Sequence, residues 1–82
     1  MVKHMRTKAL LINRKGFDIV EVEQEASIYS SNGISYAMGE RINGVRVYLE
    51  NNYFSPEYLF QSLLYGVIEL IKDNAIIERQ EV

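Results

Sequence analysis

Two Asn-Gly pairs, Asn32-Gly33 and Asn43-Gly44, interrupt a stretch rich in β-branched and aromatic residues, and they constrain the fold more than any other feature. Asn-Gly between such segments is the strongest local hairpin signal, because both residues tolerate the positive φ that a two-residue turn requires. Lys15-Gly16 is a third glycine-bearing break. We therefore predict a four-stranded antiparallel meander, with strands near Met5–Arg14, Phe17–Ser30, Ile34–Ile42 and Val45–Glu50.

Loop length decides which side chains share a face of this sheet, since a shift of one residue reverses every side chain. A two-residue Asn43-Gly44 loop sets Ile42 opposite Val45. In the middle hairpin, a two-residue loop sets Tyr29 opposite Tyr36, whereas a three-residue loop sets Ile28 opposite Tyr36. We favour the three-residue loop because it gathers the apolar side chains on one face and leaves the other face polar. That apolar face would hold Ala9, Leu11, Val20, Val22, Ile28, Tyr36, Met38, Ile42, Val45, Val47 and Leu49.

The first hairpin carries a charge pattern that selects its register. A two-residue Lys15-Gly16 loop pairs Lys8 with Glu23 and Arg6 with Glu25 on the polar face. Each opposite-charge pair across strands contributes about 0.2–1 kcal/mol, enough to favour one register but little toward overall stability. Glu21, Glu23 and Glu25 are therefore interpreted as a solvated ion-pair ladder and not as a metal site.

A single helix follows the strands. Ser55 is placed to cap it, Pro56 suits the first helical position and Glu57 complements the helix dipole. Apolar residues then recur at helical spacing as far as Asp73, with Asn74 as the stop. We predict an α+β fold in which this C-terminal helix packs on the apolar face of the meander, with a short fifth strand as an option at residues 75–77.

Size and helix composition point to self-association. A chain of 82 residues forms one domain, assigned here to residues 1–82, with residues 1–4 taken as disordered or non-native. Such a chain buries only about 60–65% of its unfolded surface, and it contains no cysteine that a disulfide would need. The apolar arc of the helix covers about 140–180°, wider than the stripe of about 100° that a surface helix needs. We expect a homodimer, with candidate contacts Tyr65, Leu70, Ile76 and Ile77.

The residues that usually carry catalysis are scarce. His4 is the only histidine, it lies near the chain start, and no serine, cysteine or acidic residue stands at a motif spacing from it. The five glycines are dispersed and form no phosphate-binding loop. We therefore expect no enzymatic activity, no catalytic residue, no cofactor and no metal site.

Basic and aromatic residues supply a candidate contact surface. Residues 1–16 hold five basic and no acidic residues, although the net charge of the chain is −2. Across the last hairpin, Arg41 and Arg46 oppose one another beside Tyr48 on the predicted outer face, where they would form a cationic and aromatic contact patch. In the alternative interpretation, Glu40 and Glu50 pair with the two arginines and the face is simply exposed to solvent. Tyrosine and arginine are frequent in binding surfaces. The candidate contacts with a partner or nucleic acid are Arg14, Lys15, Arg41, Arg46 and Tyr48.

Three functions follow as hypotheses. The leading one is a small, non-catalytic, homodimeric regulator or accessory factor that binds another macromolecule. The alternatives are a nucleic-acid-binding protein that uses the basic residues, and a small-ligand-binding module between sheet and helix.

No apolar stretch reaches the roughly 20 residues of a membrane span, and none resembles a signal peptide, which favours a cytoplasmic protein without membrane contact. The abundance of isoleucine and asparagine is typical of a bacterial or phage protein. Tyr53, Phe54 and Tyr58 are expected to close the end of the core.

Overall fold

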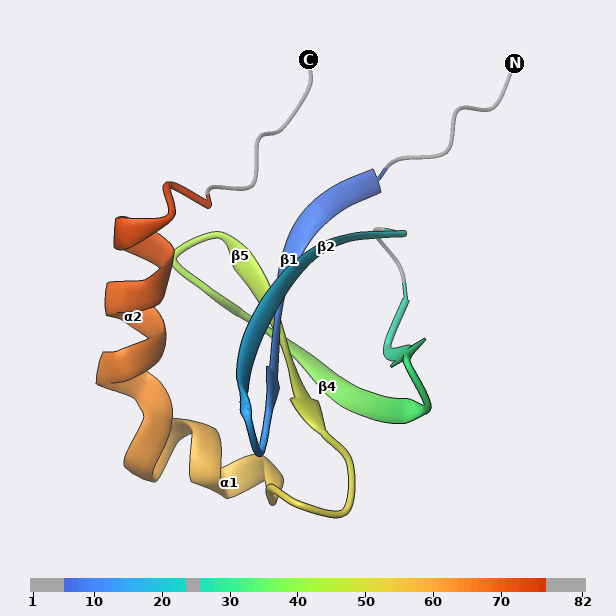
Figure 1. The fold of residues 1–82 in the computed structure, drawn as a ribbon. Helices are drawn as coiled ribbons and strands as arrows, with labels where there is room; N and C mark the ends of the chain where they lie inside the picture. The colour runs from blue at the N-terminus through green and yellow to red at the C-terminus, as the bar shows by residue number, and fades with distance from the viewer. Residues whose placement is uncertain (1–5, 24–25, 77–82) are drawn as a thin grey trace.

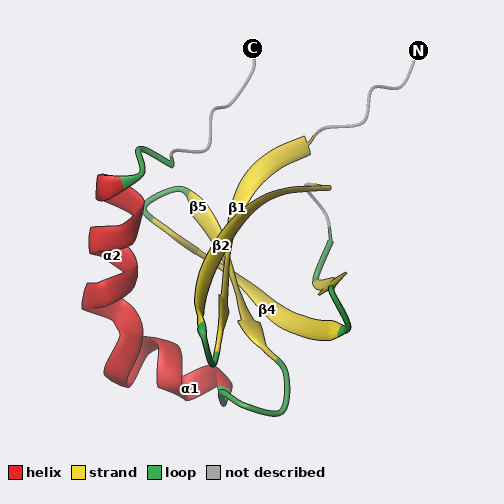
Figure 2. Cartoon of the chain, viewed as in Figure 1, coloured by secondary structure: helices red, strands yellow, loops and turns green. Residues whose placement is uncertain are grey.

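A computed structural model describes residues 6–23 and 26–76. Five strands precede one helical segment, which lies along one face of a curled sheet (Figures 1 and 2). The helical segment is continuous from residue 56 to residue 73 and contains a π-helical stretch. The elements are β1 (Arg6–Asn13), β2 (Gly16–Glu23), β3 (Ile28–Ser31), β4 (Ile34–Ile42), β5 (Val45–Glu50), α1 (Pro56–Tyr58), the π-helix η1 (Leu59–Leu63) and α2 (Leu64–Asp73).

The sheet is mixed, and this overturns the predicted four-stranded meander. Its strand order is β2-β1-β5-β4-β3, and β1 runs parallel to β5 with Ala9 opposite Arg46 and Ile12 opposite Leu49. The other neighbouring strands are antiparallel. The predicted second strand, Phe17–Ser30, is in fact two strands, β2 and β3, which lie at opposite edges of the sheet. β1 is therefore an interior strand with a neighbour on each side, whereas a meander would leave it at the edge.

The turns explain which predicted registers hold. Asn43-Gly44 is a two-residue turn with both residues at positive φ, and Ile42 faces Val45 as predicted. Asn32-Gly33 is also a two-residue turn with positive φ at both residues, so Tyr29 faces Tyr36 and the three-residue loop was the wrong choice. This register leaves the Ile28 side chain 66% exposed instead of in the apolar face.

The first hairpin turns one position earlier than predicted. Arg14 and Lys15 occupy the turn and Asn13 faces Gly16, so each pairing is displaced by two residues. Lys8 therefore faces Glu21, and Arg6 faces Glu23. A displacement of two keeps the same side chains together within the hairpin, so the basic and acidic residues still share a face. The charge ladder forms with different members, including a 3.9 Å contact between Arg6 Nε and Glu21 Oε1. The predicted partner Glu25 lies outside the described residues.

A β-bulge in β4 divides the apolar residues between the two faces of the sheet. Ala37 faces Leu49 and Glu40 faces Val47, so one extra residue stands in β4 between these pairs. The predicted pairing of Met38 with Leu49 is therefore wrong. Because a bulge reverses the alternation of the strand beyond it, Ile42 and Tyr36 face opposite sides of the sheet. The single apolar face predicted from the sequence is replaced by two hydrophobic cores.

The first core lies between the sheet and the helical segment. The segment begins at Pro56 and ends at Asp73, as predicted, and Asn74 forms its C-cap. After the cap, Ala75 has a positive φ of 52° and Ile76 folds back onto the core, where it is 2% exposed. Residues 75 and 76 form no strand, and Ile77 lies outside the described residues. The buried members of this helix-side core are Leu10, Ile12, Ile42, Val45, Val47, Leu49, Leu59, Val67, Ile71 and Ile76.

The second core fills the opposite, concave side of the curled sheet, which the sequence interpretation had left polar. Its buried residues are Ala9, Leu11, Val22, Tyr36 and Tyr48. The Tyr48 hydroxyl donates a hydrogen bond to the Ala26 carbonyl (2.5 Å), and Arg46 Nη1 donates to the same oxygen (2.6 Å). These two bonds hold the segment before β3 against β5 on the concave face. The curled sheet therefore covers the second core without help from the helix.

Candidate functional site

Three segments distant in the sequence meet at one end of the sheet. They are the β1–β2 turn, the start of β4 with the residue before it, and the end of β5 with the loop that follows it. Together they line an open hollow of about 490 Å³. We use the name Arg14 corner for this end of the sheet together with the aromatic residues next to it. It is defined by Arg14, Glu50, Tyr53, Phe54 and Tyr58. The hollow is lined by residues 13–15, 33–35 and 50–52.

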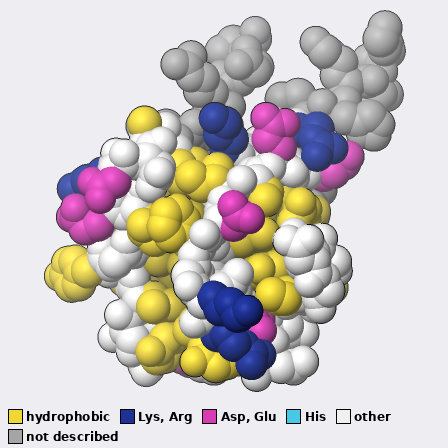
Figure 3. All heavy atoms as spheres, viewed as in Figure 1, with side chains coloured by type: hydrophobic (Ala, Val, Ile, Leu, Met, Phe, Trp, Pro, Cys, Tyr) yellow, Lys and Arg dark blue, Asp and Glu magenta, His cyan; other side chains and the backbone are white. Residues whose placement is uncertain are grey.

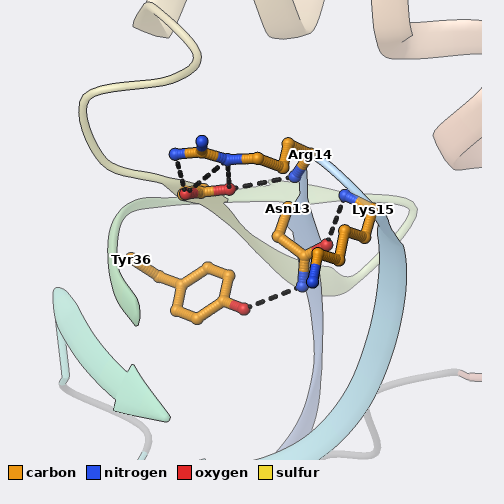
Figure 4. A network of polar contacts seen from close by, with 5 residues as sticks. Asn13, Arg14, Lys15 and Tyr36 are labelled. Atoms are coloured by element: carbon orange, nitrogen blue, oxygen red, sulfur yellow. Dashed lines mark hydrogen bonds and ion pairs between the residues drawn. The ribbon is translucent and has the colours of Figure 1, made fainter. Parts of the chain in front are cut away.

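An arginine and a carboxylate form the centre of this corner (Figure 4). Arg14 Nη2 lies 2.8 Å and Nε 3.2 Å from Glu50 Oε2, so the guanidinium binds with two nitrogens. The backbone N–H of Arg14 also donates to Glu50 Oε1, at 2.9 Å. Glu50 is 5% exposed, the one charged residue among the described residues that is buried. Its desolvation is offset because three donors of a single turn residue surround it.

The ionisation of both groups reflects this contact. Side-chain and backbone hydrogen bonds from Arg14 lower the pKa of Glu50 below its ordinary value of 4.5, and burial opposes part of that change. The hydrogen bond and charge of Glu50 raise the pKa of Arg14. Both groups are therefore charged throughout the neutral range, and the pair is a fixed structural element at physiological pH.

Asn13 continues the polar network into the second core. Its side-chain amide nitrogen donates to the Tyr36 hydroxyl (3.1 Å), and its side-chain oxygen accepts a hydrogen bond from the Lys15 N–H (2.8 Å). Figure 4 shows these two contacts beside the Arg14–Glu50 pair. An asparagine oxygen that accepts the N–H two residues later is an Asx turn, which stabilises a tight bend. The conformation of the β1–β2 turn is thus held by Asn13 within the turn and by Glu50 from β5.

Three aromatic side chains lie next to Arg14, and one of them contacts its guanidinium. The Arg14 guanidinium carbon lies 4.9 Å from the centroid of the Tyr53 ring, in a cation–π contact. Tyr53 meets Phe54 edge-on at 4.8 Å, and Phe54 stacks on Tyr58 at 5.3 Å. Phe54 packs against the helix-side core as expected, but Tyr53 (53% exposed) and Tyr58 (40% exposed) do not close it. A second hollow, of about 600 Å³, lies among these four residues and Ser55.

The structure separates the candidate contacts predicted from the sequence into two groups. Arg14 and Lys15 lie in the β1–β2 turn at the Arg14 corner. Arg41 and Arg46 oppose one another as predicted, but near the β4–β5 turn at the other end of β5. The predicted exposure of Tyr48 is wrong: it is 0% exposed, because its face of the sheet is the concave one. Glu50, an expected partner of those arginines, binds Arg14.

Arg46 is held within the fold and is only partly exposed. Its Nη1 is engaged by the Ala26 carbonyl, and its Nε is buried without a partner among the described residues. Its side chain also lies close against Gly39, where an added Cβ would stand 2.9 Å from Arg46 Cδ. Arg46 therefore links β5 to the segment before β3. The partner or nucleic-acid roles predicted for all five residues stay predictions.

The candidate self-association residues also differ in exposure. Tyr65 is 84% exposed, the most exposed large apolar side chain described. Leu70 is half-buried and packs against the helix-side core. Ile76 is used inside the chain, at 2% exposure, and Ile77 lies outside the described residues. Of the three that the structure describes, Tyr65 is therefore the one whose side chain is largely free for an external contact.

Over the described ranges, no three His, Cys, Asp or Glu side chains are grouped as a metal site would require. Within the same ranges, no helix has the length and apolar character needed to cross a bilayer. Comparisons with protein-family models, with curated proteins and with solved structures find no match to this chain.

Proposed function

We propose that this protein is a small, non-catalytic interaction protein that acts by binding another macromolecule through the Arg14 corner. One observation carries the proposal: an arginine and two tyrosines are exposed together, and they are held in place by contacts within the fold. The Arg14 side chain is 56% exposed although it is bound to Glu50. Arginine and tyrosine are among the residue types most enriched at the few positions that dominate interface energetics.

The rigidity of this corner supports binding as well as its composition. Arg14 is fixed by Glu50 on one side and by the Tyr53 ring on the other, and Phe54 and Tyr58 are stacked. Side chains that are already ordered lose less conformational entropy when a partner arrives, so more of the contact energy remains as affinity. The adjoining hollow offers space for a protruding partner side chain.

The partner hypothesis is tested with a matched pair of exposed aromatic positions. Protein bearing Tyr53→Ala and Tyr58→Ala is compared with Phe60→Ala, whose side chain is 54% exposed and lies outside both hollows of the corner. Loss of two anchor tyrosines is expected to cost about 2 kcal/mol or more, a reduction in affinity of at least tenfold. The measurement is quantitative affinity capture from candidate host extracts, followed by titration of each captured species.

A species that wild type and Phe60→Ala retain, but that the doubly substituted Tyr53→Ala and Tyr58→Ala protein loses, supports the proposal. Equal retention by all three proteins contradicts it. Mixed-sequence nucleic acid is titrated in parallel at low and moderate salt. Binding at low salt that falls by orders of magnitude as salt rises would favour the nucleic-acid alternative instead.

We also propose that the protein acts as a homodimer, with Tyr65 at the contact. The support is the exposure of this tyrosine on α2 together with the small size of the domain, which limits the core it can build alone. Light scattering at high micromolar concentration should give twice the mass of one chain for wild type and for Phe60→Ala. Tyr65→Ser should shift the distribution toward one chain. A wild-type protein with the mass of one chain would refute the dimer and leave the Arg14 corner untouched.

A further inference from the structure

Arg14 lines both hollows of the Arg14 corner. We call the hollow of about 490 Å³ the polar hollow, because its described lining residues are polar apart from Gly33 and Ile34. The hollow of about 600 Å³ is called the aromatic hollow, and Arg14 lines it together with Tyr53, Phe54, Ser55 and Tyr58. A ligand that reaches both hollows therefore meets polar groups with one part of its surface and aromatic rings with another.

The cationic groups at the polar hollow keep donors that the fold does not use. Arg14 binds Glu50 through Nε and Nη2, so Nη1, with two of the five N–H groups of a guanidinium, takes no part in that ion pair. Lys15 is exposed, and within residues 6–23 and 26–76 its ammonium forms no ion pair. Glu50 is buried and already bound by Arg14. The charge that a ligand can reach in this hollow is therefore basic.

This basic surface is small and has acidic neighbours. In Figure 3, basic side chains gather at the end of the sheet that holds the β1–β2 turn, with apolar side chains beside them. β2 follows the turn and contains Asp18, Glu21 and Glu23 without a basic residue. Arg41 and Arg46 lie at the other end of β5. A duplex carries one charge about every 3.4 Å along each strand, so nucleic acid needs a longer basic track, whereas a ligand with one or two carboxylates does not.

The aromatic hollow suits a large apolar side chain. Tyr53 and Tyr58 are both exposed, and Phe54, which contacts both rings, packs against the helix-side core. Aromatic rings pair favourably edge-on or stacked with an offset, so an incoming ring can extend this cluster and cover the exposed tyrosine surface. Glu57 precedes Tyr58 in α1 and is exposed, which favours the polar hollow as the place for a negative charge of the ligand.

We infer that the partner presents a short protein segment in which an acidic residue lies next to an aromatic one. Its carboxylate binds Arg14 Nη1 and the Lys15 ammonium at the polar hollow, and its ring packs on Tyr53 and Tyr58 in the aromatic hollow. Charge-assisted hydrogen bonds to arginine are about twice as strong as neutral ones, and tyrosine supplies contact area at low cost in conformational entropy. This inference rests on the proposed function, because it names the partner chemistry of the same corner.

The test uses ¹⁵N-labelled protein and an acetylated, amidated hexapeptide in which two aspartates precede a phenylalanine between glycine and serine residues. The reversed sequence is tested as well, to allow for either chain direction. Control peptides replace both aspartates by asparagine, or the phenylalanine by alanine. Chemical shifts of the Arg14 Nε–H and of the Lys15 and Tyr53 backbone N–H groups report binding, whereas the N–H of Tyr65, outside both hollows, should not move.

At low salt, the better aspartate peptide should bind at least about threefold more tightly than each control, since an exposed ion pair is worth up to about fivefold in affinity. Equal binding of the aspartate and asparagine peptides, or no shift at the three reporting groups up to millimolar concentration, would overturn the inference. Tighter binding of a ten-nucleotide single strand of mixed sequence at the same groups would also overturn it, in favour of nucleic acid.

A pair of lysine variants locates the carboxylate. Lys15→Gln removes the free cation and keeps the backbone N–H that donates to Asn13. It should weaken binding of the aspartate peptide about threefold or more and leave the asparagine peptide within about twofold. Lys72→Gln, at an exposed position in the last turn of α2, is the matched control and should bind both peptides as wild type does. Thermal unfolding confirms that both variants are folded.

Capture from host extracts separates this inference from the proposed function. A species lost with the doubly substituted Tyr53→Ala and Tyr58→Ala protein but retained equally by Lys15→Gln and wild type supports the Arg14 corner and contradicts an acidic partner. A species lost with both variant proteins and retained by Lys72→Gln supports both. If no species depends on the tyrosines, the proposed function fails, and the peptide titrations alone decide whether an acidic segment binds.

Discussion

Replacement of Tyr48 by alanine should destabilise the protein by about 3–5 kcal/mol, the loss typical when a large aromatic side chain is removed from a packed core. Tyr48 is 0% exposed and lies in the concave core, with its ring centroid 6.2 Å from that of Tyr29. The truncation also removes one of the two hydrogen bonds that hold the Ala26 carbonyl. A domain of this length is expected to have only about 4–12 kcal/mol of stability, so the variant should be close to unfolding at room temperature.

Urea denaturation measures this loss directly, and two further variants divide it into parts. Tyr48→Phe keeps the ring and removes only the hydroxyl, and should cost about 1 kcal/mol because Arg46 still donates to the same carbonyl. Phe60→Ala removes an aromatic side chain that is 54% exposed and should change stability by less than about 0.5 kcal/mol. If Tyr48→Ala behaved like Phe60→Ala, the second core would not contribute to folding.

The helix was predictable from the sequence because its signals are local. Pro56 at the first helical position and Asn74 at the stop lie within one turn of the backbone groups they serve, so both ends agree with the structure. The turns at Asn32 and Asn43 were also recognisable, since each dipeptide specifies its own backbone geometry. The error at Asn32 arose from the assumption of a single apolar face, which favoured the three-residue loop.

The pairing of β1 with β5 was not predictable from local signals, because it joins residues more than 35 positions apart. One signal was nevertheless present. Residues 9–12 are four consecutive apolar residues, all buried, whereas a half-exposed edge strand would alternate. A continuous apolar run is typical of a strand covered on both faces. Gly39, a glycine inside a strand pattern, was a second signal, since such glycines often mark a bulge.

In the candidate site too, local features could be predicted from the sequence and contacts between distant residues could not. Arg14 and Lys15 were identified as candidate contacts, and they do lie in an exposed turn. The partner of Arg14 was missed, because Glu50 is 36 residues away and approaches it only when β1 and β5 are neighbours. The exposure of Tyr53 was missed for a related reason: the loop that carries it extends beyond the end of the sheet and does not cover the core. Topology, and not residue type, decides which aromatic side chains reach the surface.

Glu50→Gln should therefore lower stability at neutral pH and should also remove a specific part of its pH dependence. In the wild type, the pKa of Glu50 is lowered by the hydrogen bonds from Arg14, so its carboxylate stabilises the folded state at every pH above its unfolded pKa. That contribution declines as pH falls below the ordinary value of 4.5 and is lost below the lowered folded pKa. A glutamine at residue 50 does not titrate, so the difference in stability between the two proteins should be largest at neutral pH and should shrink on acidification.

Thermal unfolding of both proteins between pH 7 and pH 2 measures this difference, and the other carboxylates cancel because both proteins carry them. Glu69→Gln, at an exposed position within α2, is the matched control and should stay parallel to the wild type across the range. A difference between Glu50→Gln and wild type that is independent of pH would show that the charge of Glu50 does not stabilise the fold.

Because Glu50 also holds Arg14 beside Tyr53, the same variant should weaken partner binding at the Arg14 corner even at temperatures where it remains folded. Loss of stability without any loss of binding would separate the ion pair from the proposed site and leave the aromatic residues as its sole anchors.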